Sequence, residues 1–280
     1  MEGFKRQVGI DVSVMKYILA TGMSIRYQNA NIVQHKLKDI NMLNYDMFKF
    51  VYCATKQNLN LDDEDIPSDY TFFKTMFYLK DNSLLNVLRK SIIFFVKEAT
   101  HENIIIDKVN GKECIIVYKS LENVPEFYLV LNEDNFNEFS SIIRMICCCE
   151  KFKIEIEEKK KNIRFKDKER QKIWEKIKAN QKHNKEKAKE KAKENILCIG
   201  DIIVKICSHP KSKYNYLNIT ELTYYQLVQE FNSIFIFDSI EFTKQQYCSY
   251  KFEFKKDPDI EWNNKLKVKI PHDVLNILQK

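Results

Sequence analysis

Cysteines and histidines are the residues of this 280-residue chain best suited to metal binding or nucleophilic chemistry. Of eight cysteines, Cys147–Cys149 stand in a row and could include one reactive thiol, and no two have C-x-x-C spacing. Cys198, Cys207 and His209 suggest zinc, but zinc needs three or four ligands that converge at about 2.0–2.3 Å. Small buried side chains on helices explain these residues better, so we expect eight free thiols and no metal site.

Catalytic motifs with a defined spacing are absent from the sequence. It contains neither the phosphate-binding patterns G-x-x-x-x-G-K-[ST] and G-x-G-x-x-G nor the hydrolase patterns H-E-x-x-H and G-x-S-x-G. The acidic run Asp62–Asp65 has neither the ligand spacing nor the glycine of a calcium-binding loop, which favours a solvated loop. The sequence therefore predicts a protein that is not an enzyme and binds no cofactor.

The overall composition is that of a globular protein with many helices. Hydrophobic residues make up 44% of the chain and charged residues 30%, a balance that disfavours wholesale disorder. Only five glycines and five prolines are present, so helices with a few hairpins are favoured over a many-stranded fold. We expect an α+β, mainly helical fold. Neither a signal peptide nor a membrane-spanning segment is expected, which predicts a cytoplasmic location.

Charge divides the sequence into three parts. Residues 151–194 hold 18 basic and 9 acidic residues, an excess of +9, so the rest of a chain with net charge +7 is at −2. This segment lacks Gly and Pro, and we expect it to be a basic helical arm. It separates a helix-and-hairpin domain, residues 1–150, from a small, mainly helical domain, residues 195–280. A contact with a partner, or with another part of this chain, is predicted at its one apolar cluster, which consists of Ile173, Trp174 and Ile177.

Hydrophobic periodicity and turn residues predict several elements of the first domain. A strand is expected within Ser24–Gln34 and a short helix over His35–Leu43. The acidic, proline-containing stretch Asn58–Asp69 predicts a loop. Leu84–Val96 has apolar residues at spacings of three and four, which predicts a helix with a broad buried face.

The sharpest local signal is Asn110-Gly111 between two β-branched segments. This pair suits the two positive-φ positions of a type I′ turn, so Ile104–Val109 and Cys114–Tyr118 are expected to form a hairpin. We expect Phe127–Leu131 to add a third strand. A helix that reaches Cys148, capped by Asn132 or Asp134, should follow with a buried stripe made of Phe136, Phe139, Ile143 and Ile146.

Two helices are predicted after the arm. The first places Ile196, Ile199, Ile203 and Ile206 on one face and ends at His209-Pro210. The second begins at a capping box between Thr223 and Gln226 and spans residues 223–234. We expect it to bury Tyr224, Leu227, Val228 and Phe231. Its aromatic face is also the second candidate for partner binding, through Tyr224, Tyr225, Leu227 and Phe231.

Four segments in a particular order add a family resemblance. They are His35–Ile40 (HKLKDI), Leu131–Phe139 followed by Ile142 and Ile143, Lys172–Lys178 (KIWEKIK) and Leu222–Val228 (LTYYQLV). In this order, which spans most of the chain, they resemble the tail assembly chaperones of siphophages that infect low-GC Gram-positive bacteria.

The resemblance implies a protein that binds the phage tape measure protein, and also the tail tube protein, in the host cytoplasm and that is absent from the finished virion. Tape measure proteins are long and helical, so recognition of an apolar helix is expected. Two alternatives stay open. One is a nucleic-acid-binding phage protein that uses the basic arm, although interleaved acids and few aromatic residues disfavour it. The other is a structural component of the tail or baseplate.

Overall fold

The computed structural model describes residues 12–59, 66–67, 69–79, 82–120, 125–151, 198–249, 258 and 260. Within these residues, seven α-helices and two small antiparallel sheets confirm the predicted α+β, mainly helical fold. The predicted basic arm with Ile173, Trp174 and Ile177 lies outside the described residues, as do the acidic run Asp62–Asp65 and most of the chain after Ser249.

The segment expected to hold one strand forms a small hairpin instead. Strands β1 (Ile25–Tyr27) and β2 (Ala30–Ile32) pair in antiparallel fashion around a turn in which Gln28 has a φ of 53°. The Gln28 amide then pairs with the edge of strand β5, because its Nε2 donates to the Val130 carbonyl (3.1 Å) and its Oε1 accepts from the Val130 N–H (2.9 Å). This side chain covers an edge that would otherwise be open to another strand.

The larger sheet confirms the predicted hairpin and third strand. Strands β3 (Ile104–Val109), β4 (Lys112–Ser120) and β5 (Glu126–Leu131) lie in that order, with β4 in the centre. Asn110 and Gly111 join the first two strands with φ values of 54° and 77°, as a type I′ turn requires. One face of the sheet enters the main core through the side chains of Ile115, Val117, Leu129 and Leu131.

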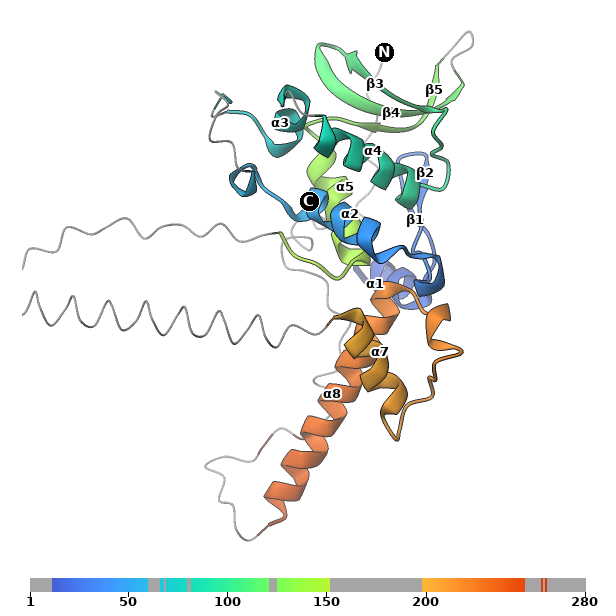
Figure 1. Cartoon of the computed structure of the whole chain (residues 1–280), viewed down its shortest axis with the longest axis vertical. Helices are drawn as coiled ribbons and strands as arrows, with labels where there is room; N and C mark the ends of the chain where they lie inside the picture. The colour runs from blue at the N-terminus through green and yellow to red at the C-terminus, as the bar shows by residue number, and fades with distance from the viewer. Residues whose placement is uncertain are drawn as a thin grey trace, which may run out of the picture.

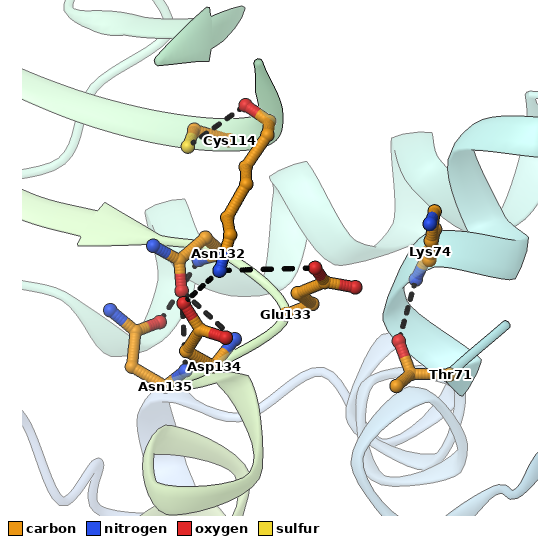
Figure 2. Close-up of polar contacts among 8 residues, drawn as sticks. Thr71, Lys74, Cys114, Asn132, Glu133, Asp134 and Asn135 are labelled. Carbon is orange, nitrogen blue, oxygen red and sulfur yellow. Dashed lines mark hydrogen bonds and ion pairs between the residues drawn. The ribbon is translucent and has the colours of Figure 1, made fainter. Parts of the chain in front are cut away.

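A polar cluster joins this sheet to helix α5 (Phe136–Ile146) (Figure 2). Asn132 Oδ1 accepts the backbone N–H groups of Asp134 (3.0 Å) and Asn135 (3.3 Å), so the turn is closed before the helix starts. Lys112 Nζ reaches over from the hairpin to Asp134 Oδ2 at 2.5 Å and Glu133 Oε1 at 4.0 Å. The cap position itself belongs to Asn135 rather than to either predicted residue. The predicted apolar stripe is confirmed, because Phe136, Phe139, Ile143 and Ile146 are all buried.

Helices α1 (Val12–Thr21), α2 (Met42–Cys53), α3 (Phe72–Tyr78) and α4 (Ser83–Phe95) complete the first part of the chain (Figure 1). Helix α4 confirms the predicted helix over Leu84–Val96. The helix predicted over His35–Leu43 is wrong. A single 3-10 turn spans Leu37–Asp39, Ile40 is extended, and Asn41 Oδ1 caps α2 by accepting the Leu43 N–H.

Aromatic side chains fill the main core where α2, α4 and α5 meet. The Tyr52 ring on α2 lies 6.2 Å from both Phe95 on α4 and Phe136 on α5, and 5.9 Å from Phe139. The Tyr52 hydroxyl contacts Ser91 Oγ at 2.6 Å, so its polar end is satisfied inside the core. This core therefore fixes three helices against one another through both packing and a buried hydrogen bond.

A second, smaller core forms between α7 (Ile199–Ser208) and α8 (Tyr224–Tyr247). Its buried members are Ile206, Ile219, Leu222 and Leu227. Helix α7 ends at the C-cap His209 and α8 begins with the Thr223–Gln226 capping box, and both features were predicted. Helix α8 is longer than the predicted residues 223–234, because it continues to Tyr247.

The two cores are joined by an exchange of side chains. Leu37, from the first part of the chain, packs against the second core, and its N–H donates to the Leu222 carbonyl at 2.9 Å. In return Tyr225 of α8 is buried in the main core. The Gln226 Nε2 also donates to the Ala20 carbonyl at the end of α1 (2.9 Å). The α7–α8 pair is therefore held on the rest of the molecule at the N-terminal end of α8.

Candidate protein-binding surface

The start of α8 is fixed by a capping box and by two ion pairs. Thr223 Oγ1 accepts the Gln226 N–H (3.2 Å), and Gln226 Oε1 accepts the Thr223 N–H (2.9 Å). Just before the helix, Glu221 accepts hydrogen bonds from Lys36 (2.8 Å) and Lys38 (2.6 Å), and these lower the pKa of Glu221 to about 2. The first turn of α8 is thus positioned by groups that are far away in sequence.

The predicted partner-binding residues at the start of α8 lie against this chain. Tyr225 and Leu227 are buried, each in a different core, and Phe231 packs against the second core. The Tyr224 ring lies 5.2 Å from the Tyr45 ring. These contacts explain the apolar pattern that the sequence shows. A partner-binding role for these four residues stays a prediction. In this structure their side chains pack against other residues of this chain.

Lys49 sits beside the half-buried Tyr224. Its Nζ lies 5.2 Å from the centre of the Tyr224 ring and 5.4 Å from that of Tyr45, and it pairs with Asp46 at 2.5 Å. A cation over two aromatic faces is attracted by their quadrupoles. Burial raises the pKa of Tyr224, so this phenol is neutral at physiological pH. The Lys49 contacts therefore help to hold the start of α8 on α2.

Helix α7 packs against Leu227, Phe231 and Ile234 of α8 in the second core (Figure 1). The chain returns from the end of α7 to the start of α8 through residues 209–222 (Figure 1). The end of α7 is attached to α8 by His209 Nε2, which lies 3.1 Å from Asp238 Oδ1, and by the ion pair between Lys211 and Glu241. Beyond these contacts α8 extends past the end of α7.

Two phenylalanines on the outer part of α8 form the most exposed aromatic surface of that helix. Phe235 is 68% exposed and Phe242 is 60% exposed. Residues seven apart lie within about 20° of each other around an α-helix, so both rings are on the same side, which we name the Phe235–Phe242 face. Between them lie the exposed polar residues Asp238 and Ser239. Exposed aromatic residues of this kind are typical anchors for a partner protein.

The Phe235–Phe242 face lies beyond the helix predicted from the sequence, which ended at residue 234. The residues that follow, Phe235 to Tyr247, contain no Gly or Pro, and apolar residues continue through Ile240 and Phe242. That absence of a stop signal was sufficient to extend the helix. The exposure of the two rings could not be predicted, since it depends on which elements pack against each side of α8.

The residues that suggested zinc have other roles. Cys198 caps α7 by accepting the Asp201 N–H at 3.4 Å, and His209 contacts Asp238. All eight cysteines are free thiols. In the part of the chain that the structure describes, no three Cys, His, Asp or Glu side chains are grouped so that they could hold a metal ion. The same residues include no helix with the length and apolar character needed to span a membrane.

One comparison with known proteins identifies a related domain. Residues 187–267 match the model of the family described as YomV second domain, which is derived from Bacillus phage. The matched segment contains α7 and α8 with the Phe235–Phe242 face, and covers less than a third of the chain. No curated protein and no solved structure matches the chain. The similarity therefore associates the C-terminal part of this chain with phage proteins.

Proposed function

We propose that this chain is a phage tail assembly chaperone that binds an apolar helical segment of the tape measure protein on the Phe235–Phe242 face. The single observation behind this proposal is the exposure of two large aromatic side chains on one side of a helix within the segment that matches a phage-derived domain family. We further propose that the role is non-enzymatic and is exercised in the host cytoplasm, that the tail tube protein is a second partner, and that the chain is absent from the finished virion.

The physical basis of binding is burial of the two rings. Full burial of a phenylalanine side chain is worth about 1.5–3 kcal/mol, so the two rings contribute about 3–6 kcal/mol. Association costs about 4 kcal/mol or more, so further contacts along α8 are needed for a stable complex. A helical partner would present apolar residues at i, i+3, i+4 and i+7 and pack along α8. Contacts with α7 and with the main core hold α8 in place, so little additional ordering of the helix is needed on binding.

Co-expression with the tape measure protein of the same phage, followed by affinity capture, tests the proposal. The double variant Phe235→Ser/Phe242→Ser should reduce capture at least ten-fold, because each lost anchor costs roughly 1–2 kcal/mol. Its melting temperature should stay close to that of the wild type, since both rings are exposed.

The matched control replaces two other exposed aromatic residues, Tyr17 on α1 and Tyr216 before α8, which are 63% and 60% exposed. Tyr17→Ser/Tyr216→Ser should capture the tape measure protein as well as the wild type does. If the two double variants behave alike, the Phe235–Phe242 face is not the binding surface. If the wild type captures no tape measure protein, the chaperone proposal is rejected.

The basic excess of residues 151–194 supports a second candidate function, nucleic-acid binding. Charge reversal at Lys185, Lys187, Lys189 and Lys191 would then abolish a steeply salt-dependent binding to DNA or RNA. The chaperone proposal instead predicts that Trp174→Ala weakens partner capture by about 1–3 kcal/mol if this residue contacts the partner. Mass spectrometry of purified virions separates the chaperone from the third candidate, a structural component of the tail or baseplate.

A further inference from the structure

Cys53 and Cys149 bring two thiols together from distant parts of the sequence. Cys53 is the last residue of α2 and only 2% exposed, whereas Cys149 follows α5 and is partly exposed. Their Sγ atoms lie 3.2 Å apart although 96 positions separate the two residues in the chain. The two thiols therefore meet between the C-terminal ends of α2 and α5, two helices that pack in the main core.

The backbone after α5 is arranged so that Cys149 faces α2. Cys148 has a φ of 50°, in the left-handed region that favours glycine. Its N–H donates to the Met145 carbonyl (3.1 Å), and the Cys149 N–H donates to the Arg144 carbonyl (3.0 Å). These two hydrogen bonds define a Schellman motif with cysteine where glycine is usual. Cys147 is buried in the main core, and Cys149, which is only partly exposed, packs against the same core.

We propose that Cys53 and Cys149 form an oxidation site, in which a peroxide converts the two thiols into a disulfide that links α2 to α5. The peroxide first oxidises the partly exposed Cys149 thiol to a sulfenic acid and releases one water. The Cys53 sulfur then attacks the Cys149 sulfur, an S–S bond forms, and the sulfenic hydroxyl leaves with the Cys53 proton as a second water. The two thiols lose two electrons and two protons, and hydrogen peroxide is reduced to two waters.

The surroundings of Cys149 determine how fast this site reacts. A hydrogen bond with Cys147, together with burial, raises the pKa of the Cys149 thiol to about 12. Because the thiolate is the reactive species, oxidation at neutral pH is slow. The exposed thiols of Cys198 and Cys248 therefore react before this pair and serve as internal indicators that the oxidant is active.

Mass spectrometry of the full-length protein tests the proposal directly. The reduced protein is treated with hydrogen peroxide, remaining thiols are alkylated, and the protein is digested without reductant. We expect a cross-linked peptide pair that contains Cys53 and Cys149. We also expect the melting temperature of the oxidised protein to rise by about 5–10 °C, because the link closes a long loop, and to return to its initial value after reduction.

Three variants make the assignment specific. Cys53→Ser should form no such cross-link, and its Cys149 should be trapped as a sulfenic acid by a cyclic 1,3-dione. Cys149→Ser should form neither product, whereas Cys147→Ser should keep the Cys53–Cys149 cross-link. The proposal is overturned if the folded wild type becomes oxidised at Cys198 and Cys248 while Cys53 and Cys149 stay unlinked. It is equally overturned if Cys147 replaces Cys149 as the partner of Cys53 in the wild type.

Discussion

Gly22 directly follows α1 and lies next to Thr223 and Gln226 at the start of α8. Its φ is +73°, and a Cβ added there would lie 3.1 Å from Thr223 Cγ2 and 3.5 Å from Gln226 Nε2. Two separate effects therefore oppose any side chain at this position, a strained backbone and a close neighbour. Gly111 in the β3–β4 turn has a similar φ of +77° but open space around the added atom.

We expect Gly22→Ala to lower the free energy of unfolding by about 1–2 kcal/mol, and by more than Gly111→Ala does, because only the first substitution also crowds α8. Urea denaturation of both variants beside the wild type measures the difference. Equal losses would mean that the contact between Gly22 and α8 contributes nothing beyond backbone strain.

Glu221 gives a pH-dependent contribution at the same junction. Its pKa is lowered from an ordinary 4.5 to about 2 by Lys36 and Lys38, so its stabilising effect is complete above pH 4.5 and is lost as the pH falls toward 2. Glu221→Gln should therefore be less stable than the wild type at pH 6, and the difference should shrink across this window. Thermal melts from pH 2 to 7 test this, with Lys36→Met/Lys38→Met as a control that should remove the same pH dependence. A difference that is constant with pH would contradict it.

At the scale of single elements, the Thr223 side chain caps the N-terminus of α8. Thr223 supplies the hydroxyl of the capping box, and its Cγ2 also faces Gly22. Thr223→Ala should lower the free energy of unfolding by about 1 kcal/mol, the usual cost of losing an N-cap. Thr223→Ser keeps the hydroxyl and should recover most of that loss in the same chemical denaturation experiment. If serine is as damaging as alanine, the methyl contact rather than the cap is what stabilises this helix end.

The elements that the sequence predicted best are those with local signals. Asn110-Gly111 specifies its turn through backbone φ alone, and Thr223 with Gln226 specifies a helix start within four residues. The helix predicted over His35–Leu43 was wrong because Asn41 caps a new helix and Leu37 is drawn into the second core. The Leu37 contact is invisible in a periodic pattern because it depends on residues far away in the chain, whereas the Asn41 cap is a local signal that hydrophobic periodicity does not report.

The candidate binding surface was also only partly predictable from the sequence pattern. Tyr224, Tyr225, Leu227 and Phe231 were selected from an apolar face, but an apolar face has the same appearance whether it is covered by this chain or by a partner. The structure separates the two cases, because these side chains pack internally while Phe235 and Phe242 remain exposed. Such a distinction requires knowledge of which elements lie next to each other.

At the scale of the whole molecule, the exchange of Tyr225 and Leu37 between the two cores predicts cooperative unfolding. Tyr225→Ala should lower the free energy of unfolding by about 3–5 kcal/mol, the usual cost of removing a buried aromatic ring. Tyr216→Ala, an exposed tyrosine before the same helix, should change it by less than about 0.5 kcal/mol. Calorimetry and circular dichroism of the wild type should report the same single transition. Two separate transitions in the wild type would show that the cores are energetically independent.

The central claim, that the outer part of α8 receives a helical segment of the tape measure protein, is tested most directly by hydrogen–deuterium exchange. Amide exchange is compared for the protein alone and with saturating tape measure protein. We predict slower exchange within residues 231–247 on binding, and no such change for Phe235→Ser/Phe242→Ser. Protection confined to other parts of the chain, with residues 231–247 exchanging at the same rate in both samples, would contradict the account.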